Sequence, residues 1–149
     1  MRIILANDHG AFGRKKEIQD WLLARGHEVK NLGVDSEERV DYADKAAEAA
    51  ALYLRGGWDL GILLCGTGIG ISIAANKIAG IRCALVHDTY TARMAREHND
   101  ANFLALGGRV ELTQSLGDIL SAFLDARFEG GRHIARLAKI SALEQPRGE

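Results

Sequence analysis

The sequence has little cysteine, a single proline and no long hydrophobic run. Its two cysteines, Cys65 and Cys83, belong to no Cys-x-x-Cys pair, which argues against a disulfide framework or a zinc site and favours reduced thiols in a cytoplasmic protein. The only proline is Pro146. The longest uncharged stretch, 60–75, is too short to cross a bilayer. The apolar run at the start of the sequence ends at Asn7, which is too early for a signal peptide. We therefore expect no membrane segment.

Charge and composition exclude further classes of partner. The formal net charge is −1, which predicts no general affinity for nucleic acid or for an anionic membrane. Hydrophobic residues make up 47% of the chain and charged residues 26%, a composition typical of globular proteins. At 149 residues, with no internal repeat, the chain fits one domain spanning 1–149.

Short apolar runs alternate with amphipathic stretches along the chain. This alternation predicts a doubly wound, Rossmann-like α/β fold: a five-stranded parallel sheet with helices on both faces. The run 60–65 is continuously apolar, as expected of a strand buried on both faces. We expect strands at 2–6, 27–32, 60–65, 82–86 and 103–106, and helices at 12–25, 42–54, 71–78, 89–97, 115–128 and 132–143.

Polar candidate groups follow four of these five strands. Ligands of doubly wound sheets bind beyond the carboxyl ends of the strands, where the strand order switches. The groups in these places are Asn7-Asp8-His9, Cys65-Gly66-Thr67-Gly68, His87-Asp88 and Gly107-Gly108-Arg109. The sequence therefore predicts a binding site at this edge of the sheet.

The segment from Cys65 to Ser72 is the most informative part of the chain. Its alternating glycines, Gly66, Gly68 and Gly70, stand between a buried strand and a helix. Such a loop lets backbone N–H groups approach an anion closely, and the helix N-terminus adds positive partial charge. A thiol at this junction gains stabilisation of its thiolate, which would lower its pKa below the ordinary value of about 8.5. We expect Cys65 to act as a base or nucleophile.

Other interpretations of this loop fit the residues less well. A phosphate-binding P-loop needs a lysine at the end of its glycine-rich segment, and none occurs between Cys65 and Lys77. The dinucleotide fingerprint needs glycine where Ile71 stands, although Asp88, twenty residues after Gly68, resembles the ribose-binding acid. A nucleotide-binding module therefore stays open as an alternative. So does a tight turn with an inert buried cysteine, because free cysteine is among the most buried residue types.

Histidines and arginines supply further candidates. His98 ends a helix, where its protonated form is favoured by the helix dipole, which fits either capping or proton transfer. Arg132 and Arg136 are four residues apart and would share one helix face, either as a phosphate clamp or as a solvated pair. Arg109 is a better-placed third cation. His87 has no second histidine at metal-ligand spacing, so we expect no metal site.

The residues also resemble a known family, ribose-5-phosphate isomerase B and the related sugar-phosphate isomerases. The resemblance spans almost the whole chain in order and combines three specific motifs, Cys-Gly-Thr-Gly, His-Asn-Asp and Glu-Gly-Gly-Arg-His. The matching segments are Asp8-His9-Gly10 with Phe12, Ser36-Glu37-Glu38-Arg39 with Asp41-Tyr42, Cys65–Ser72 with Ala74-Ala75-Asn76-Lys77, Gly80-Ile81-Arg82, Arg96–Asn102, Gly108-Arg109-Val110 and Glu129–His133.

The resemblance implies a function and a role for each site residue. The chain would interconvert ribose 5-phosphate and ribulose 5-phosphate without metal or cofactor, with Cys65 as the base between C1 and C2 and His98 opening the sugar ring. The groups implied to bind or stabilise the substrate are Asp8, His9, Gly66, Thr67, Gly68, Ile69, Gly70, Asn99, Arg109, Arg132 and Arg136. Another subclass carries a glutamate base where this chain has Ile71, which leaves Cys65 as the base candidate in the loop.

The resemblance also implies a cytoplasmic homodimer, or a dimer of dimers, whose C-terminal helix is exchanged and whose sites take residues from both copies.

One departure from the family pattern bears on substrate preference: the family usually has proline where this chain has Ala43. The alternatives are an isomerase of another phosphorylated sugar, namely allose 6-phosphate, galactose 6-phosphate or a tetrose phosphate. A non-catalytic subunit is disfavoured because both Cys65 and His98 are present.

Overall fold

The computed structural model of the chain describes residues 1–144, and Pro146 lies outside the described residues. Its centre is one parallel sheet of five strands in the order β2-β1-β3-β5-β4. The strands are β1 (Arg2–Asn7), β2 (Glu28–Asn31), β3 (Leu60–Cys65), β4 (Cys83–Leu85) and β5 (Phe103–Gly107). Because β2 lies on one side of β1 and β3 on the other, the strand order switches between β1 and β3, where this architecture binds ligands. The predicted α/β fold is confirmed.

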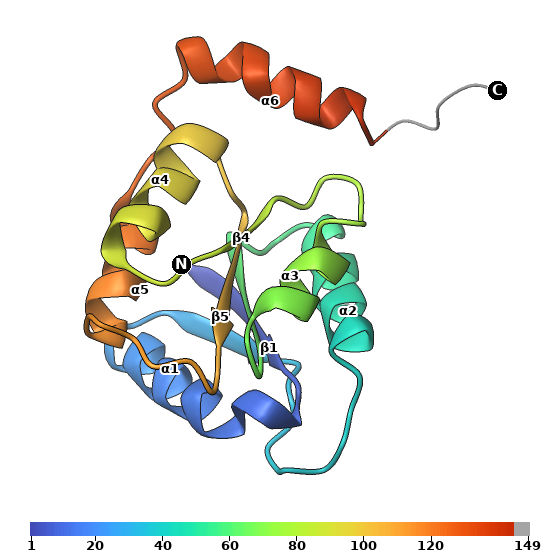
Figure 1. Ribbon diagram of the computed structural model, residues 1–149, viewed down its shortest axis with the longest axis vertical. Coiled ribbons are helices and arrows are strands. Elements are labelled where there is room, and N and C mark those ends of the chain that lie inside the picture. The colour runs from blue at the N-terminus through green and yellow to red at the C-terminus, as the bar shows by residue number, and fades with distance from the viewer. Residues whose placement is uncertain (145–149) are drawn as a thin grey trace, which may run out of the picture.

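Helices cover both faces of the sheet (Figure 1). A 3-10 turn η1 (His9–Ala11) leads into α1 (Phe12–Ala24), and the other helices are α2 (Tyr42–Leu54), α3 (Ile69–Ala75), α4 (Thr89–Asn99), α5 (Leu116–Asp125) and α6 (Arg132–Ala142). One core packs α1, α4 and α5 against alternate strand residues such as Ile62 and Leu64. The other core packs α2 and α3 against Leu63 and Cys65. The cysteine sulfur therefore belongs to the α2–α3 face.

Most predicted boundaries lie within two residues of the observed ones, and the exceptions have local causes. Helix α3 begins at Ile69 rather than 71, because Gly68 already has the left-handed backbone conformation at the N-cap. It ends at Ala75, and the side chain of Asn76 bonds both the N–H and the carbonyl of Cys83. Helix α5 ends three residues early because Ala126 is extended.

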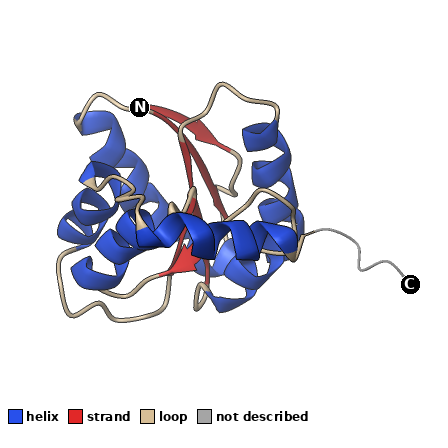
Figure 2. Cartoon of the chain, turned by 90° about the horizontal axis from the view of Figure 1, so that it is seen from above, coloured by secondary structure: helices blue, strands red, loops and turns tan. Residues whose placement is uncertain are grey.

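Helix α6 differs from the others in its setting. Among the described elements it packs chiefly on α4, and Figures 1 and 2 show it lying across the end of the sheet away from the β1–α1 connection. Its apolar residue Ile134 is 59% exposed, and Leu143, which caps its C-terminus, is 73% exposed. None of the helices formed by residues 1–144 is long and apolar enough to cross a membrane.

Candidate active site

Three loops converge at the carboxyl edge of β1, β3 and β5. The N–H of Asp8 donates to the carbonyl of Leu64 at 3.0 Å, and the N–H of Arg109 donates to the carbonyl of Gly66 at 2.9 Å. A Cβ added at Gly10 would lie 3.1 Å from the nitrogen of Gly66, so glycine at position 10 lets the first two loops touch. This edge presents the carboxyl-edge cluster: Asp8, His9, Cys65, Thr67 and Arg109.

Cys65 occupies the last position of β3 and is largely enclosed. The residue is 4% exposed, and its Sγ accepts the N–H of Gly68 at 3.1 Å. Cys83 is the other buried thiol, and burial raises its pKa to about 12. A hydrogen-bond donor directed at a sulfur favours its thiolate form. The structure therefore places a hydrogen-bonded thiol at the switch point of the sheet.

Glycine is required at position 68 for two reasons. Its φ of +79° lies in the left-handed region, which side chains rarely adopt. A Cβ there would also stand 2.8 Å from the carbonyl carbon of Leu106. The tight turn brings the β3 and β5 loops together and exposes Thr67, whose Oγ1 accepts the N–H of Ile69 at 3.2 Å.

A small cleft adjoins this cluster. It has a volume of about 290 Å³ and is lined by His9, Gly10, Phe12, Gly13, Glu37 and Arg109. The ring of His9 is oriented by the N–H of Val40, which donates to Nδ1 at 3.4 Å. The cleft thus brings a histidine and an arginine together beside the cysteine loop, which is a suitable arrangement for an oxyanion such as phosphate.

The start of α2 forms one wall of the glycine loop. A Cβ at Gly70 would lie 2.8 Å from the ring of Tyr42, so the tyrosine ring covers this glycine directly. The helix is capped by Asp41, whose carboxylate accepts the N–H of Ala43 at 2.8 Å. The proline usual in the family at position 43 has no N–H. This chain therefore gains a capping hydrogen bond that a proline would lack.

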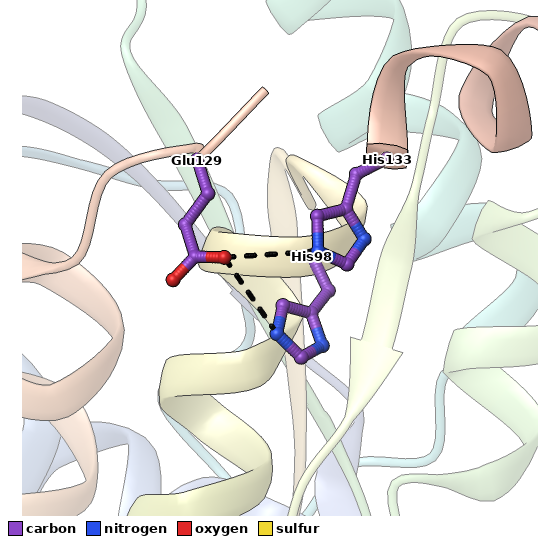
Figure 3. Close-up of side chains that lie close together, drawn as sticks. All are labelled: His98, Glu129 and His133. Atoms are coloured by element: carbon purple, nitrogen blue, oxygen red, sulfur yellow. Dashed lines mark ion pairs between the residues drawn. The ribbon is translucent and has the colours of Figure 1, made fainter. Parts of the chain in front are cut away.

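A second group of predicted residues gathers at the opposite, amino edge of the sheet. We call His98, Glu129 and His133 the histidine cluster (Figure 3). The imidazole rings of His98 and His133 stack with centroids 4.3 Å apart and an interplanar angle of 15°. The Oε2 atom of Glu129 lies 4.0 Å from Nε2 of His98 and 3.7 Å from Nε2 of His133.

The turn between α5 and α6 creates this cluster. The N–H of Glu129 donates to the carbonyl of Glu97 at 3.0 Å, which ties the turn to the end of α4. Gly130 and Gly131 both have positive φ, 67° and 53°, so the chain can reverse sharply and bring His133 over His98. Arg132 and Arg136 follow on α6, and both are exposed.

The electrostatic setting of His133 favours its neutral form. Burial lowers the pKa of His133, and the positive charges of His98, Arg132 and Arg136 lower it further, while the carboxylate of Glu129 acts in the opposite direction. The Nε of Arg132 also lies 3.4 Å from Nε2 of His133, in position to donate to it.

The geometry of the histidine cluster does not suit a metal ion, although one ligand atom of each residue lies within 4.8 Å of the others. An imidazole lone pair lies in the plane of its ring, so two nearly parallel rings direct their lone pairs side by side rather than toward one ion. Arg132 and Arg136 add positive charge beside them. The arrangement suits proton transfer and anion binding.

A network of ion pairs fixes the end of α4 that carries His98. Asp100 has a φ of +42°, and its carboxylate pairs with Arg82 and Arg96, each at 3.0 Å. Arg82 also donates to the carbonyl of Asn99 at 3.1 Å. No role was predicted for Arg82, Asp100, Glu129 or His133. The Arg82–Asp100 and His98–Glu129 contacts join segments that lie apart in the sequence, and such contacts leave no local pattern.

One chain does not bring Cys65 and His98 together. In the register of β3 with β5, Cys65 pairs with Gly107 at the carboxyl edge and Gly61 pairs with Phe103 at the amino edge. The four residue steps from Gly61 to Cys65 span roughly 13 Å, and His98 lies beyond the amino edge. Asn99, Arg132 and Arg136 accompany His98, whereas Asp8, His9, Thr67 and Arg109 accompany Cys65.

A larger cleft lies on the amino side. It has a volume of about 660 Å³ between the edge strand β4 and α6, and its lining includes Arg82, Cys83, Asn99, Ile140 and Leu143. Cys65 lines neither cleft.

Asp88, on which the nucleotide-binding alternative depended, caps helix α4. Its Oδ1 accepts hydrogen bonds from the N–H and the hydroxyl of Thr91. These bonds lower the pKa of the Asp88 carboxyl.

Comparisons with known proteins give a consistent result. Residues 3–140 match the family described as Ribose/Galactose Isomerase. Over 146 residues, 98% of each chain, the sequence is 47% identical to ribose-5-phosphate isomerase B of Escherichia coli. It is 41% identical to D-erythrulose-4-phosphate isomerase of Pectobacterium atrosepticum, covering 97% of this chain and 95% of that one. The structure of ribose-5-phosphate isomerase B from Clostridium thermocellum superimposes with a TM-score of 0.92, 50% identity and 97% coverage of both chains.

Proposed function

We propose that this chain, which belongs to the ribose/galactose isomerase family, is an aldose–ketose isomerase that interconverts ribose 5-phosphate and ribulose 5-phosphate. The observation that carries the proposal is the carboxyl-edge cluster at the β1–β3 switch point, in a chain 47% identical to a ribose-5-phosphate isomerase B. We infer one domain over residues 1–149, located in the cytoplasm and needing no cofactor.

The proposed reaction begins with ring opening. Ribose 5-phosphate is mostly a closed ring, so an acid–base group must move a proton between the C1 hydroxyl and the ring oxygen. Histidine titrates near neutral pH and suits this step, and we assign it to His98. The step leaves an open-chain aldehyde with its C2 hydrogen available.

Cys65 is the proposed base for the isomerisation. Its thiolate takes the proton from C2, and the C1 oxygen gains negative charge in an enediolate. The hydroxyl proton then passes from the C2 oxygen to the C1 oxygen, and the thiol returns its proton to C1, which gives the ketose and restores the thiolate. The Thr67 hydroxyl and the backbone N–H groups of the Gly66–Gly70 loop are placed to stabilise the developing oxyanion, as preorganised donors do. Arg109, Arg132 and Arg136 would hold the phosphate and so orient the reacting carbons.

The separation of Cys65 from His98 requires a second copy of the chain. We infer a homodimer, or a dimer of dimers, in which the amino-edge group of one copy faces the carboxyl-edge cluster of the other. Two features support this. Helix α6 carries the exposed apolar residues Ile134 and Ile140, and it borders the 660 Å³ cleft. In this arrangement α6 is exchanged, and Arg132 and Arg136 reach the other copy's sugar phosphate.

Cys65 is 4% exposed and lines neither cleft of the single chain, so a substrate would reach the sulfur by a narrow approach. Proton abstraction needs one open approach to the sulfur, and exclusion of water strengthens the interaction of charges in a site. The hydrogen bond from Gly68 supports the thiolate while the strand holds Cβ in place. The sulfur's remaining contacts with the α2–α3 core keep its orientation fixed.

A second candidate is a tetrose 4-phosphate isomerase. The 41% identical relative named D-erythrulose-4-phosphate isomerase favours it, and the Ala43 difference lies next to Tyr42, on the wall of the glycine loop. The same acid–base groups would serve, without the need for ring opening.

A panel of sugar phosphates tests the proposal. Ribose 5-phosphate, allose 6-phosphate, galactose 6-phosphate and erythrose 4-phosphate are assayed for conversion to the corresponding ketoses, with unphosphorylated ribose as control. We expect the highest kcat/KM for ribose 5-phosphate. We also expect a loss of about 10³-fold or more without the phosphate, because its binding energy orients the reacting carbons. A higher kcat/KM for another sugar would replace the proposed substrate, and no conversion of any sugar would refute the proposal.

A further inference from the structure

Glu129 is the acidic member of the histidine cluster and faces both imidazoles (Figure 3). One oxygen, Oε2, lies 4.0 Å from Nε2 of His98 and 3.7 Å from Nε2 of His133. Its backbone N–H is bonded to the carbonyl of Glu97 at the end of α4, so the turn that carries the carboxylate is fixed beside the pair, while the side chain itself is 53% exposed.

The two histidines differ sharply in their access to water. The side chain of His98 is 33% exposed, whereas that of His133 is 4% exposed. The rings lie face to face at 4.3 Å. A positive charge on both rings is unfavourable at this distance because like charges repel. The pair therefore prefers to hold a single added proton.

The charges that surround the pair decide which ring holds that proton. From α6, Arg132 and Arg136 oppose a charge on His133, and from α4, His98 does so as well. Nε of Arg132 lies 3.4 Å from Nε2 of His133 and donates toward it. This contact needs a lone pair on Nε2, which the neutral ring can supply and the protonated ring cannot. Glu129, in the turn before α6, is the carboxylate that faces the pair among the described residues.

We propose that Glu129 is a positioning residue that keeps the stacked His98–His133 pair singly protonated, with the proton on the more exposed His98. This inference rests on the proposed function, because it supplies His98 with the proton that it donates to the ring oxygen during opening. His133 serves as the neutral, buried platform against which the His98 ring is stacked. With the two arginines included, the unit stays positively charged and is suited to a phosphorylated substrate.

The test is a pH titration of Glu129→Gln, which keeps the size of the side chain and removes its charge. The His98 imidazole is followed by the NMR signal of its ring C2 proton, assigned by its absence in His98→Ala. We expect the titration midpoint of His98 to fall by about 0.5–1 pH unit, because a carboxylate about 4 Å away favours the charged imidazole and solvent screens part of the effect. Glu17→Gln removes a carboxylate from an exposed position on α1, and it should leave the midpoint in place.

Turnover supplies the second readout. In Glu129→Gln the alkaline limb of kcat/KM for ribose 5-phosphate, where His98 loses the proton that it donates, should move to lower pH by the same amount. The profile for erythrose 4-phosphate, which needs no ring opening, should stay in place. A general loss of structure would change both substrates alike. An unmoved His98 midpoint, or equal changes for the two sugars, would overturn the role of Glu129. Inactivity of the unaltered enzyme on ribose 5-phosphate would instead overturn the proposed function, since the NMR titration needs no turnover.

Discussion

Cys65→Ala is expected to lower kcat for ribose 5-phosphate by about 10²–10⁴-fold, the usual contribution of a positioned acid–base group. The variant removes the sulfur that accepts the C2 proton but leaves the arginines and the glycine loop unchanged. Binding of ribose 5-phosphate should therefore remain measurable. Steady-state kinetics together with calorimetric titration of the sugar phosphate would separate the two quantities.

Cys83→Ala is the matched control for that variant. Cys83 is the second thiol of the chain and lies in the same α2–α3 core as Cys65, so both substitutions remove a buried sulfur of equal size. We expect Cys83→Ala to retain turnover. Substantial turnover by Cys65→Ala would rule out the sulfur as the base, and equal losses in both variants would assign the effect to packing.

The second large effect is expected for His98→Ala and depends on the form of the substrate. For ribose 5-phosphate, kcat/KM should fall by about 10²–10⁴-fold, because the variant relies on the small fraction of open aldehyde in solution. Erythrose 4-phosphate cannot close a five-membered ring, because its C4 oxygen carries the phosphate. Its kcat/KM should fall by less than about tenfold. The measurement compares kcat/KM for both sugars in both proteins.

His87→Ala provides the control, because His87 is an exposed histidine outside both groups of site residues. It should leave both rates close to those of the unaltered enzyme. Equal losses for the pentose and the tetrose in His98→Ala would contradict a role in ring opening, and would place His98 in the isomerisation step or in substrate binding.

The fold follows closely from sequence because its signals are local. The apolar run that forms β3, Leu60–Cys65, has the predicted bounds, and α2 begins at Tyr42 directly after a capping aspartate. The errors arise at helix ends that are set by the backbone conformation of a single residue or by contacts across a neighbouring loop. Gly68 starts α3 early through its left-handed backbone, and the Asn76 bonds to Cys83 across a loop accompany its early end.

The candidate site was predictable as a set of residues but not as an arrangement. The βα pattern alone placed Asp8, Cys65 and Arg109 at one edge of the sheet, because parallel strands align their carboxyl ends. The end of α4 with His98 lies instead beyond the amino edge, before β5 begins. The anchoring of Glu129 to Glu97 and the stacking of His133 on His98 join segments thirty residues or more apart along the chain, and no sequence period encodes them.

The most direct test of the shared site is to mix two inactive variants. Cys65→Ala and His98→Ala are unfolded together, refolded at equal concentrations and assayed with ribose 5-phosphate, with each variant refolded alone as control. If each site combines Cys65 of one copy with His98 of the other, half of the dimers are mixed and each carries one intact site, so about a quarter of normal activity should return. A mixture as inactive as its components would contradict a site divided between two copies.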